Sequence, residues 1–211
     1  MKYLIFFGVI FILLVSSASA NLLITEIMYN PSSEMGSDTD LEWVELYNYD
    51  KDSFNLTFFE LNSKSIDSMV IEPNGYLVIA RELWDGTDAD NDSFLNFYSS
   101  IYPKTYSNIS IVDSGAFVLS NTEGEIIISN GSINFSTHYL DDFGGDGNGY
   151  SLELVNGTWL ESKELYGTPG RANTAEFKEE LVEKGLKLES YLEKEIYTNY
   201  NYDQLFKIKF L

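Results

Sequence analysis

The 211-residue chain is 44% hydrophobic and 15% aromatic, which is ample for a packed core and excludes a disordered chain. Its formal net charge of −20 makes nucleic acid a poor partner, because the phosphate backbone would be repelled. The chain contains no cysteine, so its core has to hold without disulfide bonds.

The first 20 residues have the pattern of an export signal. Lys2 supplies a positive charge, residues 3–15 form an apolar run, and Ala18 and Ala20 frame a small-residue cleavage site. The apolar run is shorter than the roughly 20 residues that span a bilayer, although an uncleaved N-terminal anchor stays open as an alternative. We expect residues 1–20 to be a signal peptide cleaved after Ala20, which makes the protein secreted or cell-surface bound, with no membrane span after cleavage.

Two N-terminal stretches alternate with the period of a β-strand. In residues 22–29, alternation places Thr25 and Ile27 on one face and Ile24 and Glu26 on the other. Residues 41–48 are predicted to form the central strand of a β-sandwich. One face would carry Leu41, Trp43, Glu45 and Tyr47, and the other Glu42, Val44, Leu46 and Asn48. We expect this tryptophan-bearing strand to lie inside a two-layer antiparallel sandwich, with Trp43 buried and its neighbours packed around it.

The chain continues as short strands separated by turns rich in proline, glycine and asparagine. Further strands are expected at 55–62, 75–81, 115–120, 125–129, 133–139, 150–155 and 158–162. Pro73-Asn74-Gly75 and Asn156-Gly157 are strong turn signals, and 115–120 with 125–129 reads as a hairpin. A short helix is predicted near 94–101 within the less regular part at 82–114. This pattern predicts an all-β sandwich.

The composition changes after residue 173. Residues 174–190 carry Glu/Lys pairs near i,i+4 spacing and are predicted to form a helical linker. Residues 191–211 are β-prone, but one strand does not fold alone, so we expect them to begin a further domain of a longer protein.

Six segments resemble, in the right order, the lamin tail domain family. They are residues 24–31, 42–48, 73–79, 114–127 (through the turn at Gly124), 149–153 and 168–173. The resemblance implies an immunoglobulin-like sandwich over residues 21–173, of the prokaryotic exported type, with a binding or scaffolding role and no catalysis. Such modules are often fused to secreted hydrolases or to adhesive modules.

Catalysis has little support in the residues. The chain has no G-x-S-x-G motif and a single histidine, His138, which we expect to be a structural or surface residue. Glu26, Glu42 and Glu45 lie on strands that could pair, and two such carboxylates can hydrolyse glycosidic bonds at a suitable separation. The favoured interpretation is that these glutamates accept backbone hydrogen bonds.

Calcium is the more credible ligand. Asp88, Asp90 and Asp92 alternate as in a D-x-D-x-D loop, and carboxylate oxygens suit Ca²⁺. The EF-hand pattern would place glycine at Ser93 and glutamate at Ser99, so the match is partial. A second acidic group consists of Asp141, Asp142 and Asp146. Solvated acidic loops are the alternative for both.

Glycosylation is indicated by N-x-[ST] sequons. They occur at Asn55, Asn91, Asn108, Asn130, Asn134 and Asn156. With the export signal they predict a cell-surface glycoprotein whose 15 tyrosines contact a protein or glycan partner. The sequence therefore predicts a non-catalytic exported binding or scaffold module. The alternatives are an accessory domain of a secreted hydrolase and a calcium-stabilised surface-layer or adhesion module.

Overall fold

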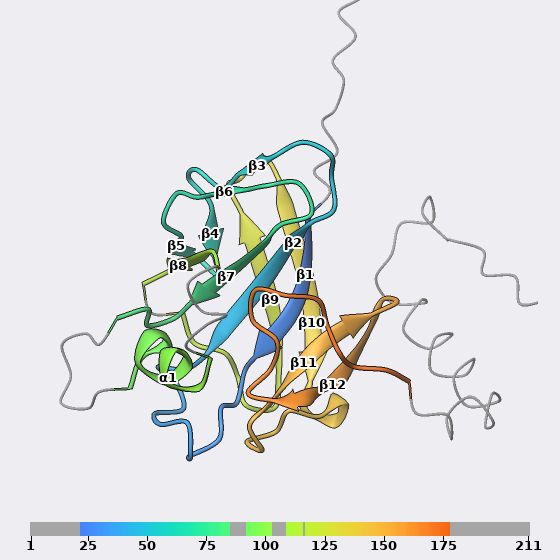
Figure 1. Ribbon diagram of the computed structural model, residues 1–211. Helices are drawn as coiled ribbons and strands as arrows, with labels where there is room; N and C mark the ends of the chain where they lie inside the picture. The colour runs from blue at the N-terminus through green and yellow to red at the C-terminus, as the bar shows by residue number, and fades with distance from the viewer. Residues whose placement is uncertain (1–21, 85–91, 103–108, 116, 178–211) are drawn as a thin grey trace, which may run out of the picture.

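The described residues fold as a β-sandwich with helix α1 on an outer face (Figure 1). The computed structural model describes residues 22–84, 92–102, 109–115 and 117–177. The strands of the larger sheet are β1 (Leu22–Met28), β2 (Trp43–Asn48), β7 (Tyr76–Ala80), β8 (Ile111–Asp113), β11 (Tyr150–Val155) and β12 (Thr158–Leu165). The remaining strands are β3 (Phe54–Asn55), β4 (Glu60–Leu61), β5 (Lys64–Ser65), β6 (Val70–Ile71), β9 (Glu123–Ser129) and β10 (Asn134–Leu140). A short 3₁₀ turn, Asp141–Phe143, follows β10.

The strands form two main sheets. The larger sheet has the order β12-β11-β1-β2-β7-β8, the smaller has the order β10-β9-β4-β5, and β3 pairs with β6. Among the described strands every pairing is antiparallel except that of β7 with β8. The predicted all-β immunoglobulin-like sandwich is confirmed, and β2 lies in the middle of the larger sheet as expected.

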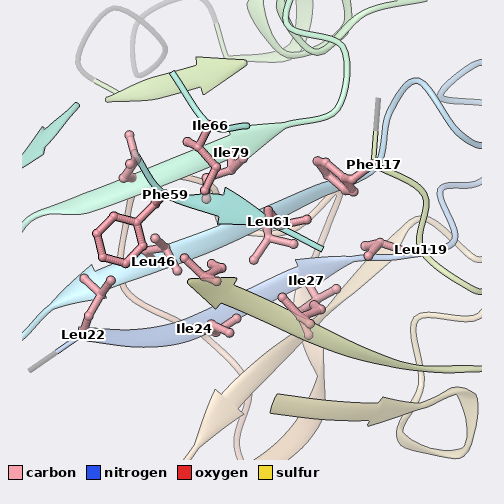
Figure 2. Close-up of a cluster of buried hydrophobic side chains, with 14 of the residues drawn as sticks. Leu22, Ile24, Ile27, Leu46, Phe59, Leu61, Ile66, Ile79, Phe117 and Leu119 are labelled. Carbon is pink, nitrogen blue, oxygen red and sulfur yellow. The ribbon is translucent and has the colours of Figure 1, made fainter. Parts of the chain in front are cut away.

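The main core fills the space between the two sheets. Figure 2 shows side chains of β1 and β2, such as Ile27 and Leu46, meeting Leu61 of β4. Ile24 and Ile27 both lie in this core, although strict alternation places them on opposite faces. The register shifts between Ile24 and Glu26, and this bulge turns one extra residue of β1 toward the core.

Trp43 lies on a strand and is buried as expected, but on the outer face of the larger sheet and not between the two sheets. Its fully buried ring belongs to a second cluster on the outer face of the larger sheet, together with Met28 and Val78. Helix α1 (Phe94–Ile101) covers this cluster with Phe94 and Tyr98, whose rings meet Trp43 edge-on at centroid distances of 6.3 and 6.2 Å. Both faces of β2 are therefore buried, one by the second sheet and one by the helix.

Helix α1 confirms the helix predicted near 94–101. The Ser93 side chain caps it by accepting a hydrogen bond from the Asn96 amide (3.3 Å). The amide of Phe94 donates to the carbonyl of Glu82 at 2.9 Å, so the first turn is also tied to the chain that leaves β7. The apolar side of the helix then packs on the Trp43 cluster.

Two predicted strands are not formed. Residues 55–62 are interrupted because Asn55 Oδ1 accepts from the Thr57 amide (2.9 Å) and Phe58 has a φ of +64°. Residues 117–120 run irregularly, since the Leu119 amide donates to the Glu42 carboxylate rather than to a strand. The hairpin in this region joins β9 to β10 instead. Of the predicted helix at 174–190, residues 174–177 are irregular, and the rest lies outside the described residues together with 191–211.

Trp43→Ala is expected to lower the free energy of unfolding by about 3–5 kcal/mol, because it empties the space under α1 and removes the Nε1 donor to Tyr98 (2.8 Å). Trp84→Ala is the matched control, since Trp84 is 69% exposed, and it is expected to change the free energy by less than about 0.5 kcal/mol. Urea unfolding measures both variants. Equal losses in the two would contradict the placement of Trp43.

Candidate functional site

Three neighbouring strands place three glutamates in a row on the outer face of the larger sheet. Glu26 on β1 is the register partner of Glu45 on β2 and of Glu153 on β11. All three side chains are fully buried. We call them the carboxylate row. The expectation that Glu26 and Glu45 lie on paired strands is confirmed.

Residues 166–175, the closing segment, cross over this row. The backbone comes close enough that a Cβ on Gly167 would lie 2.5 Å from Glu26 Oε1, and Gly167 also has a φ of +77°. Only glycine tolerates both conditions. The closing segment therefore covers Glu26 directly, with no room for another group between them.

Each carboxylate of the row accepts hydrogen bonds from the chain itself. Glu26 Oε1 accepts from Ser151 Oγ (2.5 Å) and the Thr168 amide (2.7 Å). Glu45 accepts from Thr25 Oγ1 (2.8 Å) and the Gly170 amide (2.7 Å). These donors satisfy buried oxygens that would otherwise be costly to remove from water.

Glu153 holds the far end of the closing segment. Its Oε2 accepts from the backbone amides of Thr174 and Ala175, and its Oε1 accepts from Ser162 Oγ at 2.7 Å. Amide donors to a carboxylate are among the stronger hydrogen bonds in proteins. The segment is thus fastened at three successive carboxylates.

The hydroxyl of Thr168 lies between two carboxylates, 2.9 Å from Glu26 Oε2 and 2.9 Å from Glu153 Oε1. A hydroxyl has one proton and can donate to only one of them. The other contact is a hydrogen bond only if that carboxyl is protonated and donates to the hydroxyl. Geometry alone therefore points to one proton held within the row.

The pKa directions of Glu26 and Glu45 agree with a proton held in the row. Burial raises the pKa of Glu26 to about 8, opposed by the donor Ser151 and reinforced by the nearby charge of Glu153. Burial, with the charge of Glu26, also raises the pKa of Glu45 well above its ordinary value. Both shifts favour a retained proton in the row. With the proton on Glu26, this carboxyl donates to the Thr168 hydroxyl, which in turn donates to Glu153.

Glu42 is separate from the row, because it lies three residues before Glu45 and points to the opposite face of the sheet. Its Oε2 accepts from the Leu119 amide (2.8 Å), and its Oε1 has no hydrogen-bond partner within the described part of the chain. Burial raises its pKa to about 8. Glu42 therefore anchors residues 117–120 and is not brought together with Glu26.

The carboxylate row binds the closing segment to the sheet, and its geometry does not match that of a catalytic pair of carboxyl groups. A glycosidase needs two carboxyl groups open to a sugar, whereas the oxygens of Glu26 and Glu45 meet donors of their own chain under the closing segment. His138, the other residue considered for catalysis, lies exposed on β10.

The calcium hypothesis stays a prediction. Asp88 and Asp90 lie outside the described residues, and Asp92 Oδ2 accepts from the Ser37 amide at 2.6 Å. Asp141 and Asp142 begin the 3₁₀ turn. In the second acidic group, Asp146 Oδ1 accepts from Asn30 Nδ2 at 2.7 Å. Within the described ranges, no group of three His, Cys, Asp or Glu residues is arranged to hold a metal ion.

The sequons divide into two sets. Four asparagines are exposed, namely Asn55, Asn130, Asn134 and Asn156. Asn91 and Asn108 lie outside the described residues. No helix in the described part of the chain is long and apolar enough to cross a membrane.

Sequence reasoning missed Glu153 and Thr168. The alternation of residues 150–155 puts Ser151 and Glu153 on one face, which is a usable signal. It does not say that β11 pairs with β1, because that pairing joins residues more than 120 positions apart. Thr168 lies in the family-like segment 168–173, for which the sequence assigns no contact.

The comparisons with known proteins agree with this architecture. Residues 15–134, more than half of the chain, match the Lamin Tail Domain family. The chain belongs to the lamin tail domain family. Lamin tail domains are immunoglobulin-like and typically non-catalytic. A search of curated proteins and a search of solved structures each found no match. The family match ends before β11 and β12, which the structure places in the same sheet as β1 and β2.

Glu26→Gln is expected to keep the free energy of unfolding within about 1 kcal/mol of wild type near neutral pH, because an amide reproduces the protonated acid. Glu26→Ala is expected to lose about 2–4 kcal/mol, since the buried donors of Ser151 and Thr168 are left unpaired. Urea unfolding measures both.

The same variants test the pH dependence. A buried acid whose folded pKa is raised stabilises the fold at low pH, and that contribution is lost as pH rises from about 4.5 toward 8. Wild-type stability is therefore expected to fall over this window, and Glu26→Gln to fall less steeply. The exposed Glu123→Gln is the matched control for removing one carboxylate from the surface. A Gln variant as unstable as Glu26→Ala would contradict the shared proton.

Proposed function

We propose that this lamin tail protein is an exported, non-catalytic binding or scaffold module of the cell surface. The observation that carries the proposal is the use of the buried carboxylates: both oxygens of Glu26 and of Glu45 are hydrogen-bonded to groups of the chain itself. The groups best suited to acid–base chemistry thus stabilise the fold. A rigid immunoglobulin-like body suits the presentation of a surface to a partner.

Export is supported by the N-terminal pattern of Lys2, the apolar run at 3–15 and the small residues Ala18 and Ala20. The exposed sequons support a glycoprotein, because glycosylation requires asparagine on an accessible surface. The partner is a protein or a glycan, as an immunoglobulin-like domain suggests. The acidic surface supports a basic or neutral partner rather than an anionic one.

Calcium remains a proposed ligand of Asp88, Asp90 and Asp92. Such a site would make the protein a calcium-stabilised surface or adhesion module. Calorimetric titration of the full chain with millimolar Ca²⁺ tests this, and the absence of both heat and a change in melting temperature would overturn it.

If the protein is exported, substitutions at Ala20 are expected to differ in whether the signal peptide is cleaved. In a host with a secretion pathway, the full chain is expected to appear outside the cytoplasm with Asn21 as its first residue. Ala20→Arg is expected to block processing, because the site requires a small side chain, whereas Ala20→Ser is expected to be processed normally. Intact mass and N-terminal sequencing read out both variants. Wild-type protein that stays unprocessed in the cytoplasm would contradict the proposal.

A further inference from the structure

A pocket lies on the outer face of the smaller sheet, on the opposite side of the sandwich from the carboxylate row. Its volume is about 450 Å³, within the range of small-molecule sites. Strands β4 and β9 form its floor, since Ile126 and Ile128 point into the core and Ile127 and Ser129 therefore point out. The turn that carries Phe58 forms a wall.

Phe58 is held in a conformation and an exposure that both disfavour folding. Its side chain is 87% exposed and its φ is +64°, a region that bulky residues rarely adopt. The turn closes with the Phe59 amide donating to the Leu56 carbonyl (3.2 Å), so Phe58 occupies a position where glycine or asparagine is preferred. Strain of this kind concentrates at functional sites, where it presents a side chain.

The other lining residues are held in place by hydrogen bonds and present polar groups to the pocket. The Asn62 side chain accepts from the Ile127 amide (2.8 Å) and donates to the Glu125 carbonyl (3.2 Å), which fixes the turn against β9. Asn130 Oδ1 accepts from the amides of Ser132 and Ile133, so its Nδ2 donor stays available. A ligand would thus meet fixed neutral amides beside an aromatic ring.

The lining chemistry selects the ligand class. An aromatic face and the exposed edge of Ile127 suit an apolar surface, while Asn130, Ser129 and Glu60 suit hydroxyl groups. None of the described lining residues is basic, and the chain has a net charge of −20, so an anionic ligand would be repelled. A sugar ring combines a C–H face with peripheral hydroxyls and matches both parts.

We propose that this Phe58 pocket binds a neutral saccharide ring, stacked on Phe58 and hydrogen-bonded by Asn130 and its neighbours. The inference deepens the proposed binding function and rests on it. The sugar has two possible sources. Asn130 is itself a sequon residue and lines the pocket, so the ring belongs either to a glycan on this chain or to a glycan of another molecule.

The first experiment uses the full chain from a host without N-glycosylation, tested on an array of neutral oligosaccharides with sialylated and sulfated ones beside them. Neutral sugars are expected to bind, Phe58→Ala to weaken binding by about tenfold or more, and Phe58→Tyr to retain it because the ring persists. Trp84→Ala removes an exposed aromatic outside the pocket and is expected to bind as wild type. Preference for the anionic sugars, or unchanged binding by Phe58→Ala, would overturn the proposal.

Phe58→Gly separates function from structure. Glycine accepts the positive φ, so this variant is expected to melt about 2 °C higher than wild type while losing saccharide binding. If the role of Phe58 were merely structural, Phe58→Gly would lower both the melting temperature and the saccharide affinity.

The second experiment uses glycosylated protein to distinguish the two sources. If the ring belongs to the Asn130 glycan, nuclear Overhauser contacts link it to Phe58 and free sugar is excluded. Ser132→Ala removes the sequon while leaving the Asn130 side chain in place, and is then expected to restore binding of free sugar. If it belongs to another molecule, glycosylated wild type binds free sugar. The proposal is overturned when neither free sugar nor the attached glycan contacts Phe58. That outcome leaves export and protein binding intact, so it is distinguishable from failure of the proposed function.

Discussion

The fold depends on one hydrogen-bonded chain, Glu26 to Thr168 to Glu153, beneath the closing segment. Three buried carboxylates side by side would repel each other if all were ionised. A retained proton removes part of that repulsion. It also lets one carboxyl donate a hydrogen bond to the Thr168 hydroxyl, which accepts it and donates its own proton to the other carboxylate. The last described residues are thereby fixed to β1, β2 and β11, which lie far from them in sequence.

The Trp43 cluster fastens the same segment from its other end. Tyr98 Oη accepts from Trp43 Nε1 and donates to the Tyr166 carbonyl, with both contacts at 2.8 Å. Helix α1 is therefore linked to the closing segment through a buried tyrosine. The outer face of the larger sheet is covered by these two elements together (Figure 1). The outer face of the smaller sheet keeps the Phe58 pocket and the exposed Asn130 and Asn134. The proposed saccharide site therefore lies on the face that the helix and the closing segment leave open.

Local pattern predicted the strands and turns whose cause is local. The Pro73-Asn74-Gly75 turn and the alternation in β2 follow from backbone preferences and burial of neighbours in sequence.

The break at Phe58 was missed because a phenylalanine at positive φ contradicts its own propensity. Residues 117–120 have strand composition, yet a buried Glu42 carboxylate takes the Leu119 amide instead. Burial of Trp43 on a strand was predicted, but not the helix that covers it, because the alternation is identical whether a sheet or a helix covers the residue. Pairing of Glu26 with Glu153 needed the long-range sheet order, which no local signal contains.

The protonation state of Glu26 connects the fold with the proposed function. A protonated, enclosed carboxyl stabilises the contact between the closing segment and the sheet, and it is closed to substrate. Its side-chain carboxyl ¹³C resonance, followed through a pH titration of the folded protein, tests it directly. The account predicts a protonated signal that persists at neutral pH and moves only near pH 8. A resonance that titrates near the ordinary glutamate value of about 4.3 would contradict it.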